Sequence, residues 1–359
     1  MPKELLDTVT LAIGGATGYG GVELIRLLSR HPGVRVTYLG SSSSAGKRLE
    51  EVYPHLAECA SPEALDGRLQ PLEPKAMAEA AHVVMLALPA GKSSAMAPEL
   101  LKAGVKVIDG GPDFRLSEAA AYPRWYKFEH PAPELLKEAV FGIPELYGEK
   151  ISAARLAAAP GCYPTAALLA VAPLLKAGMI EPDLIVDAKS GLSGAGRASL
   201  TLPYHFTEAA EDVCAYSLPA HRHLPEMQQE VALLCGKKTS EISVTFTPHL
   251  VPTIRGIFAT VYARLAKAAG DAELLEAMKI FYAGSPFVHV CQELPHTKWA
   301  AGTNHAFLSV RVSEDKTKAI ILSVIDNLGK GLAGQMVQCL NLMYGFAETA
   351  GLQDRAVYP

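Results

Sequence analysis

The sequence predicts an α/β protein in which a parallel sheet covered on both faces is followed by an α+β part with a large mixed sheet. Near the N-terminus, a glycine cluster separates a strand-like apolar segment from a helix-like one. Further strand-like and helical segments alternate up to residue 109, which is typical of a parallel sheet. Beyond Cys162 the strand-like segments are longer and few helical segments separate them, which favours a largely antiparallel or mixed sheet.

The order of elements follows from this pattern. The first part is expected to contain strands at residues 8–13, 34–39, 82–88 and 105–109, with helices near residues 22–28 and 94–102. The second part is expected to contain strands at residues 184–188, 242–250, 257–265, 306–312 and 319–325. A last helix is expected at residues 331–344.

Composition narrows the functional class. The 359 residues are 49% apolar and carry a net charge of −4, which fits about two globular domains. No run of Lys and Arg stands out, so nucleic acid and anionic membrane are poor partners. Because the apolar segments are short and the first residues do not resemble a signal peptide, no membrane span or export is expected. Six cysteines without a CxxC pair favour a reducing, cytoplasmic compartment.

The glycine cluster predicts a Rossmann dinucleotide-binding domain. Gly15, Gly18 and Gly21 fit the spacing G-x-x-G-x-x-G, between an expected strand and an expected helix. Glycine lets the backbone turn tightly and approach a pyrophosphate at the helix N-terminus. An ordinary tight turn is the alternative for any such glycine set alone. The cofactor-binding candidates in this turn are Gly15, Thr17, Gly18, Tyr19, Gly20 and Gly21.

The end of the second strand favours NADP over NAD. NAD-binding units usually place an acidic residue there, whereas this chain has the run S-S-S-S-A-G-K-R at residues 41–48. Hydroxyl groups and the cations of Lys47 and Arg48 suit a 2′-phosphate, although a solvated polar loop is the alternative for each cation. Small residues at 86–91 end another strand where a dinucleotide crosses the sheet. The further candidates are Ser42, Ser43, Ser44, Lys47, Leu88 and Pro89.

Cys162 is the predicted nucleophile. It lies in the turn A-P-G-C-Y-P-T at residues 159–165, directly ahead of an apolar helical run. The helix dipole and the unpaired N–H groups of a helix N-terminus favour a thiolate and can hold an oxyanion. A buried structural cysteine is the alternative. The other five cysteines have no such setting and are expected to be structural; they are Cys59, Cys214, Cys235, Cys291 and Cys339.

A histidine cluster supplies the second chemical group. The segment A-H-R-H-L-P-E contains His221, His223 and Glu226. A thiolate enzyme that makes and breaks acyl bonds needs a proton donor and acceptor near neutral pH, which histidine provides. Spacing alone does not say which imidazole faces the thiol. A zinc site is the competing interpretation, but no second pair of ligands stands at metal-binding spacing, so no metal is expected.

Five motifs together resemble the N-acetyl-γ-glutamyl-phosphate reductases of the semialdehyde dehydrogenase group over essentially the whole chain. They are G-A-T-G-Y-G-G at 15–21, P-G-C-Y-P-T at 160–165, S-G-L-S-G-A-G-R at 190–197, H-R-H-L-P-E at 221–226, and P-H-L-V-P at 248–252 with Arg255-Gly256. The family usually carries Asn at the position of Ala159, so a hydrogen bond near the thiol is either lost or supplied elsewhere.

The resemblance implies a division of the chain and a set of roles. It implies a Rossmann domain at 1–161, a catalytic and dimerisation domain at 162–327, and a C-terminal helix at 328–359 that returns to the first domain. Cys162 would be the nucleophile, His221 the acid/base, and Glu226 the residue that orients His221. The resemblance places Arg115 at the substrate phosphate and Tyr216 nearby, and Ser190, Gly191, Ser193, Gly194 and Asn327 at the cofactor. Arg222 and Arg197 are further candidate anion binders, because guanidinium groups pair well with carboxylate and phosphate; a surface salt bridge is the alternative for each.

The implied reaction is the NADPH-dependent reduction of N-acetyl-glutamyl 5-phosphate to the 5-semialdehyde plus phosphate, through a Cys162 thioester, in arginine biosynthesis. A homodimer or homotetramer is expected. Reduction of the one-carbon-longer N-acetyl-aminoadipyl phosphate in lysine biosynthesis is the nearest alternative, since its chemistry is identical. Aspartate-semialdehyde dehydrogenase is more distant, and a non-catalytic NADP-binding regulator is the alternative from another class.

Overall fold

The computed structural model describes residues 8–57 and 67–358, and Cys59 lies outside them. The chain divides into two compact units. Unit 1 comprises residues 1–160 and 332–353, and unit 2 comprises residues 161–331 and 354–359. Each unit is built around its own sheet, so the α/β class predicted from the sequence is confirmed.

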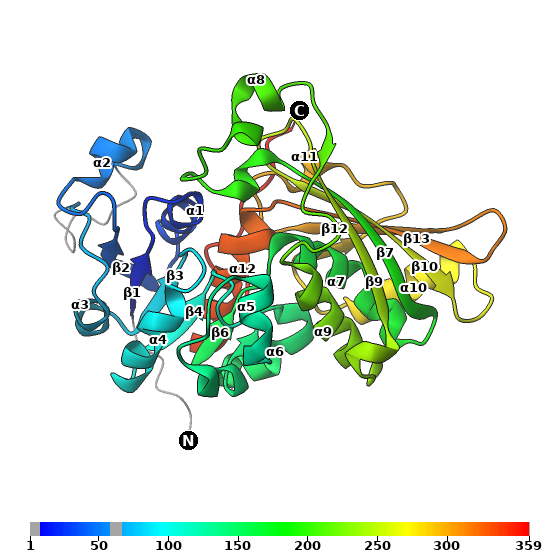
Figure 1. Cartoon of the computed structure of the whole chain (residues 1–359), viewed down its shortest axis with the longest axis horizontal. Coiled ribbons are helices and arrows are strands. Elements are labelled where there is room, and N and C mark those ends of the chain that lie inside the picture. Colours follow the sequence, from blue (N-terminus) through cyan, green and yellow to red (C-terminus); the bar gives the residue numbers. More distant parts are fainter. Residues whose placement is uncertain (1–7, 58–66, 359) are drawn as a thin grey trace. The chain divides into compact units, whose positions relative to one another are not determined.

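Unit 1 contains a six-stranded parallel sheet in the order β2-β1-β3-β4-β6-β5 (Figure 1). Its strands are β1 Val9–Gly14, β2 Val34–Gly40, β3 Val83–Leu86, β4 Lys106–Asp109, β5 Val140–Phe141 and β6 Leu156–Ala158. The central strands are buried on both faces, which explains their continuous apolar runs. Because the chain leaves β1 for β2 on one side and returns to β3 on the other, the sheet order reverses at β1, as the alternating pattern predicts for a nucleotide-binding fold.

The helices of unit 1 include one from the far end of the sequence. They are α1 Tyr19–Leu28, α2 Leu49–Val52, α3 Pro74–Ala80, α4 Ser93–Lys102, α5 Tyr122–Trp125, α6 Pro144–Ala153 and α12 Gly334–Tyr344. The C-terminal helix α12 packs against α1, α6 and β4. Lys106 Nζ on β4 donates to the carbonyl of Met343 at 2.8 Å, which holds the end of this helix.

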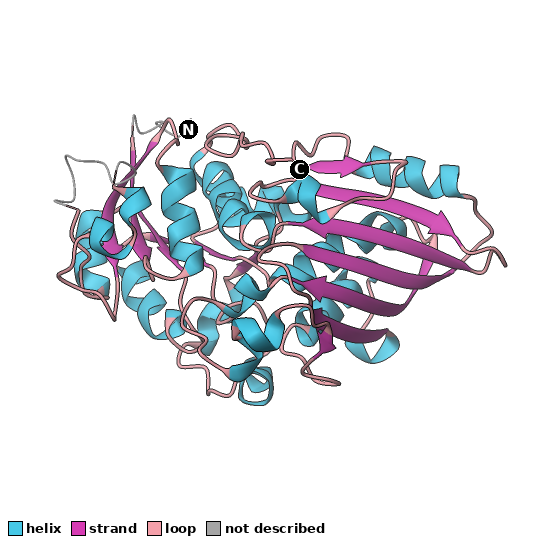
Figure 2. Cartoon of the chain, turned by 90° about the horizontal axis from the view of Figure 1, so that it is seen from above, coloured by secondary structure: helices cyan, strands magenta, loops and turns pink. Residues whose placement is uncertain are grey.

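Unit 2 contains a seven-stranded mixed sheet in the order β11-β12-β13-β10-β7-β9-β8 (Figure 2). Its strands are β7 Ile180–Ser190, β8 Cys214–Ala215, β9 Ser243–Leu250, β10 Ile257–Leu265, β11 Val288–Val290, β12 Ala306–Val312 and β13 Lys318–Ile325. The central pairs of β13, β10 and β7 are antiparallel, and the pairs β7–β9 and β11–β12 are parallel. The mixed sheet predicted from the long strand-like segments is therefore confirmed.

One face of this sheet is covered by helices (Figure 1). The helices of unit 2 are α7 Cys162–Lys176, α8 Phe206–Ala209, α9 Leu224–Cys235, α10 Asp271–Phe281 and α11 Thr297–Ala300. Helix α7 packs on β10, β13 and β7, and residues 163–175 are all buried, so the cysteine turn stands at the end of the most apolar helix. The sequence analysis expected few helices in this part of the chain and did not predict α9 and α10.

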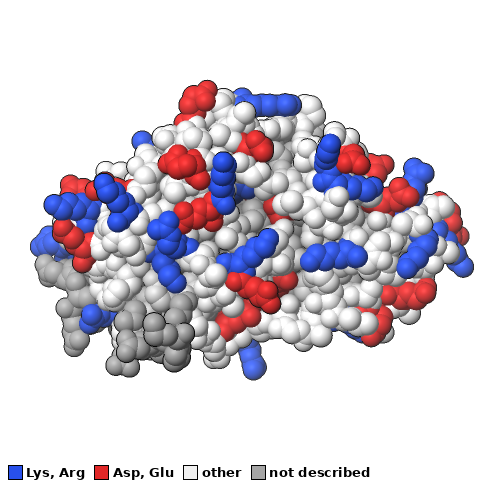
Figure 3. Space-filling model, turned by 90° about the horizontal axis from the view of Figure 1, so that it is seen from below, with Lys and Arg blue, Asp and Glu red and all other residues white. Residues whose placement is uncertain are grey.

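Positive and negative side chains are distributed evenly over the surface that Figure 3 shows. Lys and Arg side chains are intermixed with Asp and Glu on the face of the molecule shown in Figure 3. None of the helices within residues 8–57 and 67–358 combines the length and apolarity that crossing a bilayer requires.

Candidate active site

Cys162 is the first residue of α7, and Gly161 is the N-cap. A glycine N-cap has no side chain to cover the first N–H groups, and no acidic residue stands in the first turn. Cys162, which is partly buried, therefore lies among the first backbone N–H groups of the helix, at the positive end of its dipole. This setting suits a thiolate and the oxyanion that forms when it attacks a carbonyl carbon.

Glu226 holds the residue that precedes the nucleophile. Its carboxylate, which has no exposed surface, accepts a hydrogen bond from the Gly161 N–H at 2.8 Å. The other oxygen lies 4.0 Å from His223 Nε2. The sequence resemblance assigns Glu226 to His221, whereas these contacts join it to Gly161 and His223. Glu226 thus supplies a side-chain hydrogen bond at the thiol turn, where Ala159 cannot.

The His223 side chain packs against the same turn, at Gly161. A Cβ placed on Gly161 would come within 2.6 Å of His223 Cδ2 and closer still to Nε2, so the imidazole rests directly on the Gly161 backbone. The ring is buried and also packs edge-on against Tyr163 and His221, with centroids 5.9 and 4.8 Å away. A side chain at position 161 would therefore displace either the His223 imidazole or the turn that carries the thiol.

His221 lies in a buried aromatic environment. Its Nδ1 accepts a hydrogen bond from the His223 backbone N–H at 3.1 Å. Edge-on contacts with Tyr163, Tyr216 and Phe246, at centroid distances of 5.2 to 5.7 Å, surround the ring. Burial, and then the adjacent Arg222 charge, lower the pKa of His221 to about 4, so the ring is neutral at physiological pH.

Two tyrosines that pack against this imidazole also feel the charge of Cys162. Tyr216 donates from its hydroxyl to the Tyr163 hydroxyl at 3.2 Å, and Tyr163 donates to the carbonyl of His249 at 3.1 Å. Burial raises the pKa of both tyrosines, and the Cys162 charge raises them further. Both phenols therefore stay protonated, and both lie within electrostatic reach of Cys162. This brings together three predicted site residues: Cys162, His221 and Tyr216.

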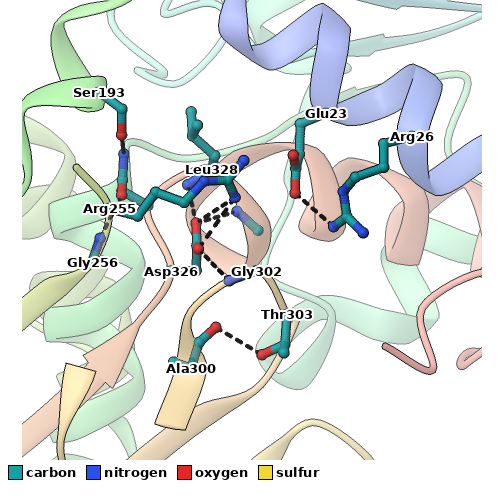
Figure 4. Close-up of polar contacts among 12 residues, drawn as sticks. Glu23, Arg26, Ser193, Arg255, Gly256, Ala300, Gly302, Thr303, Asp326 and Leu328 are labelled. Atoms are coloured by element: carbon teal, nitrogen blue, oxygen red, sulfur yellow. Dashed lines mark hydrogen bonds and ion pairs between the residues drawn. The ribbon is translucent and has the colours of Figure 1, made fainter. Parts of the chain in front are cut away.

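A buried carboxylate organises the loops at one end of the large sheet (Figure 4). Asp326, at the end of β13, has no exposed surface. It accepts hydrogen bonds from the N–H groups of Leu328, Gly329 and Gly302 at 2.6 to 2.9 Å, and it pairs with Arg255 at 3.3 Å. One side chain therefore holds three separate loops of unit 2.

Asn327 joins a fourth loop to this group. Its amide oxygen accepts from the Gly256 N–H at 2.8 Å, and its amide nitrogen donates to Ser193 Oγ at 2.9 Å. Ser193 lies in the 3-10 turn Leu192–Ala195 that follows β7. The predicted cofactor residues of unit 2 therefore gather at one place; they are Ser190, Gly191, Ser193, Gly194 and Asn327.

This loop system reaches the nucleophile. The Gly331 N–H donates to the Asp326 carbonyl at 2.8 Å, and a Cβ on Gly331 would lie 2.8 Å from Cys162 Cβ. The segment after β13 thus packs against the first residue of α7. Sequence reasoning missed Asp326, Gly331 and the contact role of His223. The signal for Asp326 was an Asp directly after a predicted strand and ahead of a Leu-Gly turn.

In unit 1, the glycine turn has the shape that a dinucleotide requires. Gly15 has φ +87°, and the N–H groups of Gly15 and Ala16 both donate to the Gly40 carbonyl. A side chain at Gly21 would collide with the Gly15 backbone, so the turn and α1 are in close contact. Gly18 is the N-cap of α1, whose first turn contains no acidic residue. The residues present therefore fit a pyrophosphate at the N-terminus of α1.

The serine loop is anchored beside this turn. Ser41 is buried and bonds through Oγ to Thr17 Oγ1 at 3.0 Å, while the Ser44 N–H donates to the same Ser41 Oγ. Ser42, Ser43 and Lys47 are exposed. Arg48 donates from Nε to Glu50 at 2.7 Å, so its guanidinium is shared with a carboxylate.

The loops that carry Leu88, Pro89 and Arg115 are pinned by Asp113. Its carboxylate accepts from the N–H groups of Gly91 and Ser94, both at 2.8 Å. Arg115 is buried and donates to the carbonyls of Ala159 and Gly110 at 2.9 Å. Burial and then the Asp113 charge raise the pKa of Asp109 to about 7. Hydrogen bonds of Asp113 and Arg115 therefore hold the loops that follow β3 and β4.

Two arginines of the sequence motifs lie on the surface of unit 2. Arg222 and Arg197 are both exposed, and Arg222 stands between the two buried histidines. Within residues 8–57 and 67–358, no group of three His, Cys, Asp or Glu side chains is arranged to hold a metal ion. Among the described residues, five cysteines take no part in a disulfide: Cys162, Cys214, Cys235, Cys291 and Cys339.

Comparison with known proteins places both parts of the chain in one family. Residues 10–154 match the family model "Semialdehyde dehydrogenase, NAD binding domain", and residues 162–327 match "Semialdehyde dehydrogenase, dimerisation domain". The N-acetyl-gamma-glutamyl-phosphate reductase of Symbiobacterium thermophilum is 46% identical over 98% of this chain and 100% of its own. The reductase of the same name from Dehalococcoides mccartyi is 48% identical over 96% of this chain and 97% of its own.

Solved structures show the same fold at lower identity. Aspartate semialdehyde dehydrogenase II from Vibrio cholerae, complexed with ASA, aligns with a TM-score of 0.71 at 20% identity, covering 94% of this chain and 98% of that one. The Candida albicans aspartate semialdehyde dehydrogenase with NADP aligns with a TM-score of 0.70 at 16% identity, covering 96% and 99%.

Proposed function

The chain belongs to the N-acetyl-gamma-glutamyl-phosphate reductases of the semialdehyde dehydrogenase family, and from that membership we propose that it reduces N-acetyl-glutamyl 5-phosphate to the 5-semialdehyde, with release of phosphate, in arginine biosynthesis. The observation that carries the proposal is the thiol at the start of α7, with its turn held by Glu226 and His223. A cysteine with a purely structural role does not require a position at a helix N-terminus or two side chains that hold the preceding residue.

In the proposed reaction, Cys162 attacks the acyl carbon and phosphate leaves, so that a thioester forms on the protein. The N–H groups at the start of α7 stabilise the tetrahedral oxyanion, and His221 faces the same reacting centre. Glu226 and His223 act as positioning residues because they hold Gly161. Splitting the reaction at the thioester replaces one difficult step by two easier ones.

A nicotinamide dinucleotide, when bound, supplies the hydride that reduces the acyl carbon. The turn Gly15, Thr17, Gly18, Tyr19, Gly20 and Gly21 would hold its pyrophosphate, beside Leu88 and Pro89. In unit 2, the loop group that Asn327 holds would meet its nicotinamide end. Arg115, Tyr216 and Arg222 are the proposed substrate contacts, since guanidinium groups pair well with phosphate and carboxylate.

We further propose that the cofactor is NADP, with Ser42, Ser43, Ser44 and Lys47 at its 2′-phosphate. The backbone of Lys47 is fixed by bonds to Ser44 and Leu69, while its side chain is exposed. A reducing cytoplasm fits the five described cysteines that are not in disulfides. The dimerisation-domain match supports a homodimer or a tetramer built from it.

Replacing Lys47 by Ala is expected to raise the KM for NADP roughly tenfold and to leave the KM for NAD unchanged, since a charged hydrogen bond contributes about 1.5–3 kcal/mol. Steady-state kinetics with both cofactors measure this. Lys102→Ala, at the exposed end of α4, is the matched control. Equal effects on both cofactors, or an unchanged KM for NADP, would remove Lys47 from the proposed site.

The function itself is tested by phosphate-dependent reduction of NADP or NAD with a panel of semialdehydes. We expect N-acetyl-glutamate 5-semialdehyde to give the highest kcat/KM. A higher value for the one-carbon-longer N-acetyl-aminoadipate semialdehyde would assign the enzyme to lysine biosynthesis, and a higher value for aspartate semialdehyde would assign it to the distant relatives. Cofactor binding without turnover of any semialdehyde would instead support a regulator.

A further inference from the structure

Resting on the proposed use of NADP, we infer that Arg68 is a cation of the site for the 2′-phosphate, and that Arg48 is not. Arg68 lies outside the serine loop, residues 41–48, in which the sequence pattern places the cations of this site. The inference stands on the way in which residues 67–70 pack against that loop, within unit 1.

Residues 67–70 are hydrogen-bonded to the serine loop at both of its ends. The Ser41 N–H, directly after β2, donates to the Gln70 carbonyl at 2.9 Å. Near the other end, the Gly46 N–H donates to the Leu69 carbonyl at 2.8 Å. The segment therefore lies beside the end of the second strand, which is where a Rossmann domain receives the adenosine ribose.

The Arg68 side chain contacts the turn that carries two of the proposed phosphate ligands. This turn runs from Ser44 to Lys47 and is closed by the Lys47 N–H, which donates to the Ser44 carbonyl at 3.2 Å. Nη1 of Arg68, an exposed residue, donates to the carbonyl of Gly46 within the turn at 3.1 Å. Because a guanidinium carries five N–H donors in a planar fork, it can bond this carbonyl and a phosphate oxygen together.

Arg48 lies opposite Arg68, but its charge is already balanced. The two arginines form an antiparallel bridge, and the Leu49 N–H donates to the Gly67 carbonyl beside it at 2.8 Å. Like charges directly opposite on neighbouring strands repel each other. Glu50 accepts from Arg48 Nε at 2.7 Å, which balances one of the two charges within the loop. An anion bound at Arg68 would balance the other and relieve the repulsion.

The 2′-phosphate of NADP suits this arrangement, whereas the 2′-hydroxyl of NAD does not. A phosphate monoester carries a charge of about −1.5 to −2 at neutral pH and several acceptor oxygens. A guanidinium can bond two of these oxygens in its plane, and the ammonium of Lys47 acts as a point charge. Arg68 would therefore supply the directional contact, and a cofactor without the phosphate would gain nothing from it.

Equilibrium binding of NADPH and NADH to the full chain without substrate, followed by nicotinamide fluorescence, tests the inference. Arg68→Gln keeps an N–H donor and loses the charge. It is expected to raise the Kd for NADPH roughly tenfold, as when one charged hydrogen bond is lost, and to leave the Kd for NADH unchanged. Arg68→Lys keeps the charge and should lose less. Arg48→Gln, at the opposite position, is the matched control and should change neither Kd.

Ionic strength gives a second readout. Because salt screens exposed charges, added salt should weaken NADPH binding less in Arg68→Gln than in the native protein. Equal weakening of NADPH and NADH by Arg68→Gln would show that Arg68 only holds the loop. An unchanged Kd for NADPH, or an equal loss in Arg48→Gln, would also overturn the inference. Since no semialdehyde is present, these outcomes leave the proposed reaction untouched, and a failed semialdehyde panel would leave the binding result standing.

Discussion

Replacing Gly161 by Ala is expected to lower kcat by at least about 100-fold, because there is no room for a methyl group between Gly161 and His223. The new Cβ would lie 2.6 Å from His223 Cδ2 and 2.7 Å from Cε1. His223 cannot yield easily, since it is buried among Tyr163, His221 and Glu226. Either the thiol turn or the imidazole segment must shift, and a displacement of about 1 Å at reacting groups costs on the order of 10²-fold.

Gly284→Ala is the matched control for this variant, because Gly284 lies in the same unit, with no atom within 4 Å of an added Cβ and no positive φ. Steady-state kinetics and alkylation of Cys162 by iodoacetamide measure both variants. A further His223→Ala change in the Gly161→Ala protein makes space and is expected to recover part of the alkylation rate. If Gly161→Ala behaves like Gly284→Ala, the contact between His223 and the thiol turn does not position the nucleophile.

Asp326→Ala is expected to destabilise unit 2 by about 3–5 kcal/mol, the usual cost of removing one partner from a buried charged group. The substitution leaves the Leu328, Gly329 and Gly302 N–H groups without their acceptor and Arg255 without this carboxylate. Activity should fall as well. The loop after Asp326 reaches Cys162 through Gly331, so its disorder would expose the start of α7.

Urea denaturation followed by the fluorescence of Trp299 measures this effect locally. Trp299 lies in α11, three residues before Gly302, and a Trp125→Phe background removes the other tryptophan. Asp326→Asn keeps one acceptor oxygen and should lose less than the Ala variant. Asp183→Ala, at an exposed position, is the control. A free energy of unfolding unchanged by Asp326→Ala would show that the carboxylate is not the centre of the loop system.

Local sequence patterns were sufficient to predict the fold class, the glycine turn and the reactive thiol. The strand, glycine turn and helix around Gly15 follow from apolar periodicity and glycine spacing, and Cys162 is recognisable because it precedes a long apolar helix. Helix α9 was missed because its buried face includes Glu226 and Glu230, which interrupt the apolar stripe. Helix α10 carries Leu274, Leu275 and Met278 at helical spacing, and this pattern was overlooked.

Contacts between distant residues could not be derived in this way. Glu226 lies 65 positions from Gly161, and no local rule connects an N–H in a turn to a carboxylate on another helix. Proximity in sequence suggested only that Glu226 orients His221, which stays a prediction. Asp326 and Arg255, 71 positions apart, meet only because β13 and β10 are neighbours in the sheet. Such contacts depend on strand order, which periodicity does not determine.

The two units divide the chemistry between them. Unit 1 carries the glycine turn and the serine loop, and unit 2 carries the thiol, the imidazole and the loops around Asp326. Within unit 2, the nucleophile is positioned from two sides, by Glu226 and His223 at Gly161 and by the Gly331 segment. Each support is a backbone contact, so substitutions outside the reacting groups should alter the reaction strongly.

The central claim is that Cys162 carries the acyl group, and peptide mass spectrometry tests it most directly. The protein is incubated with N-acetyl-glutamate 5-semialdehyde and oxidised cofactor without phosphate, digested at low pH and compared with its Cys162→Ser variant. The account predicts an N-acetyl-glutamyl thioester on the peptide that contains Cys162, lost when phosphate is added and absent from the variant. Turnover at a near-native rate by Cys162→Ser, or turnover with this thiol never acylated, would contradict it.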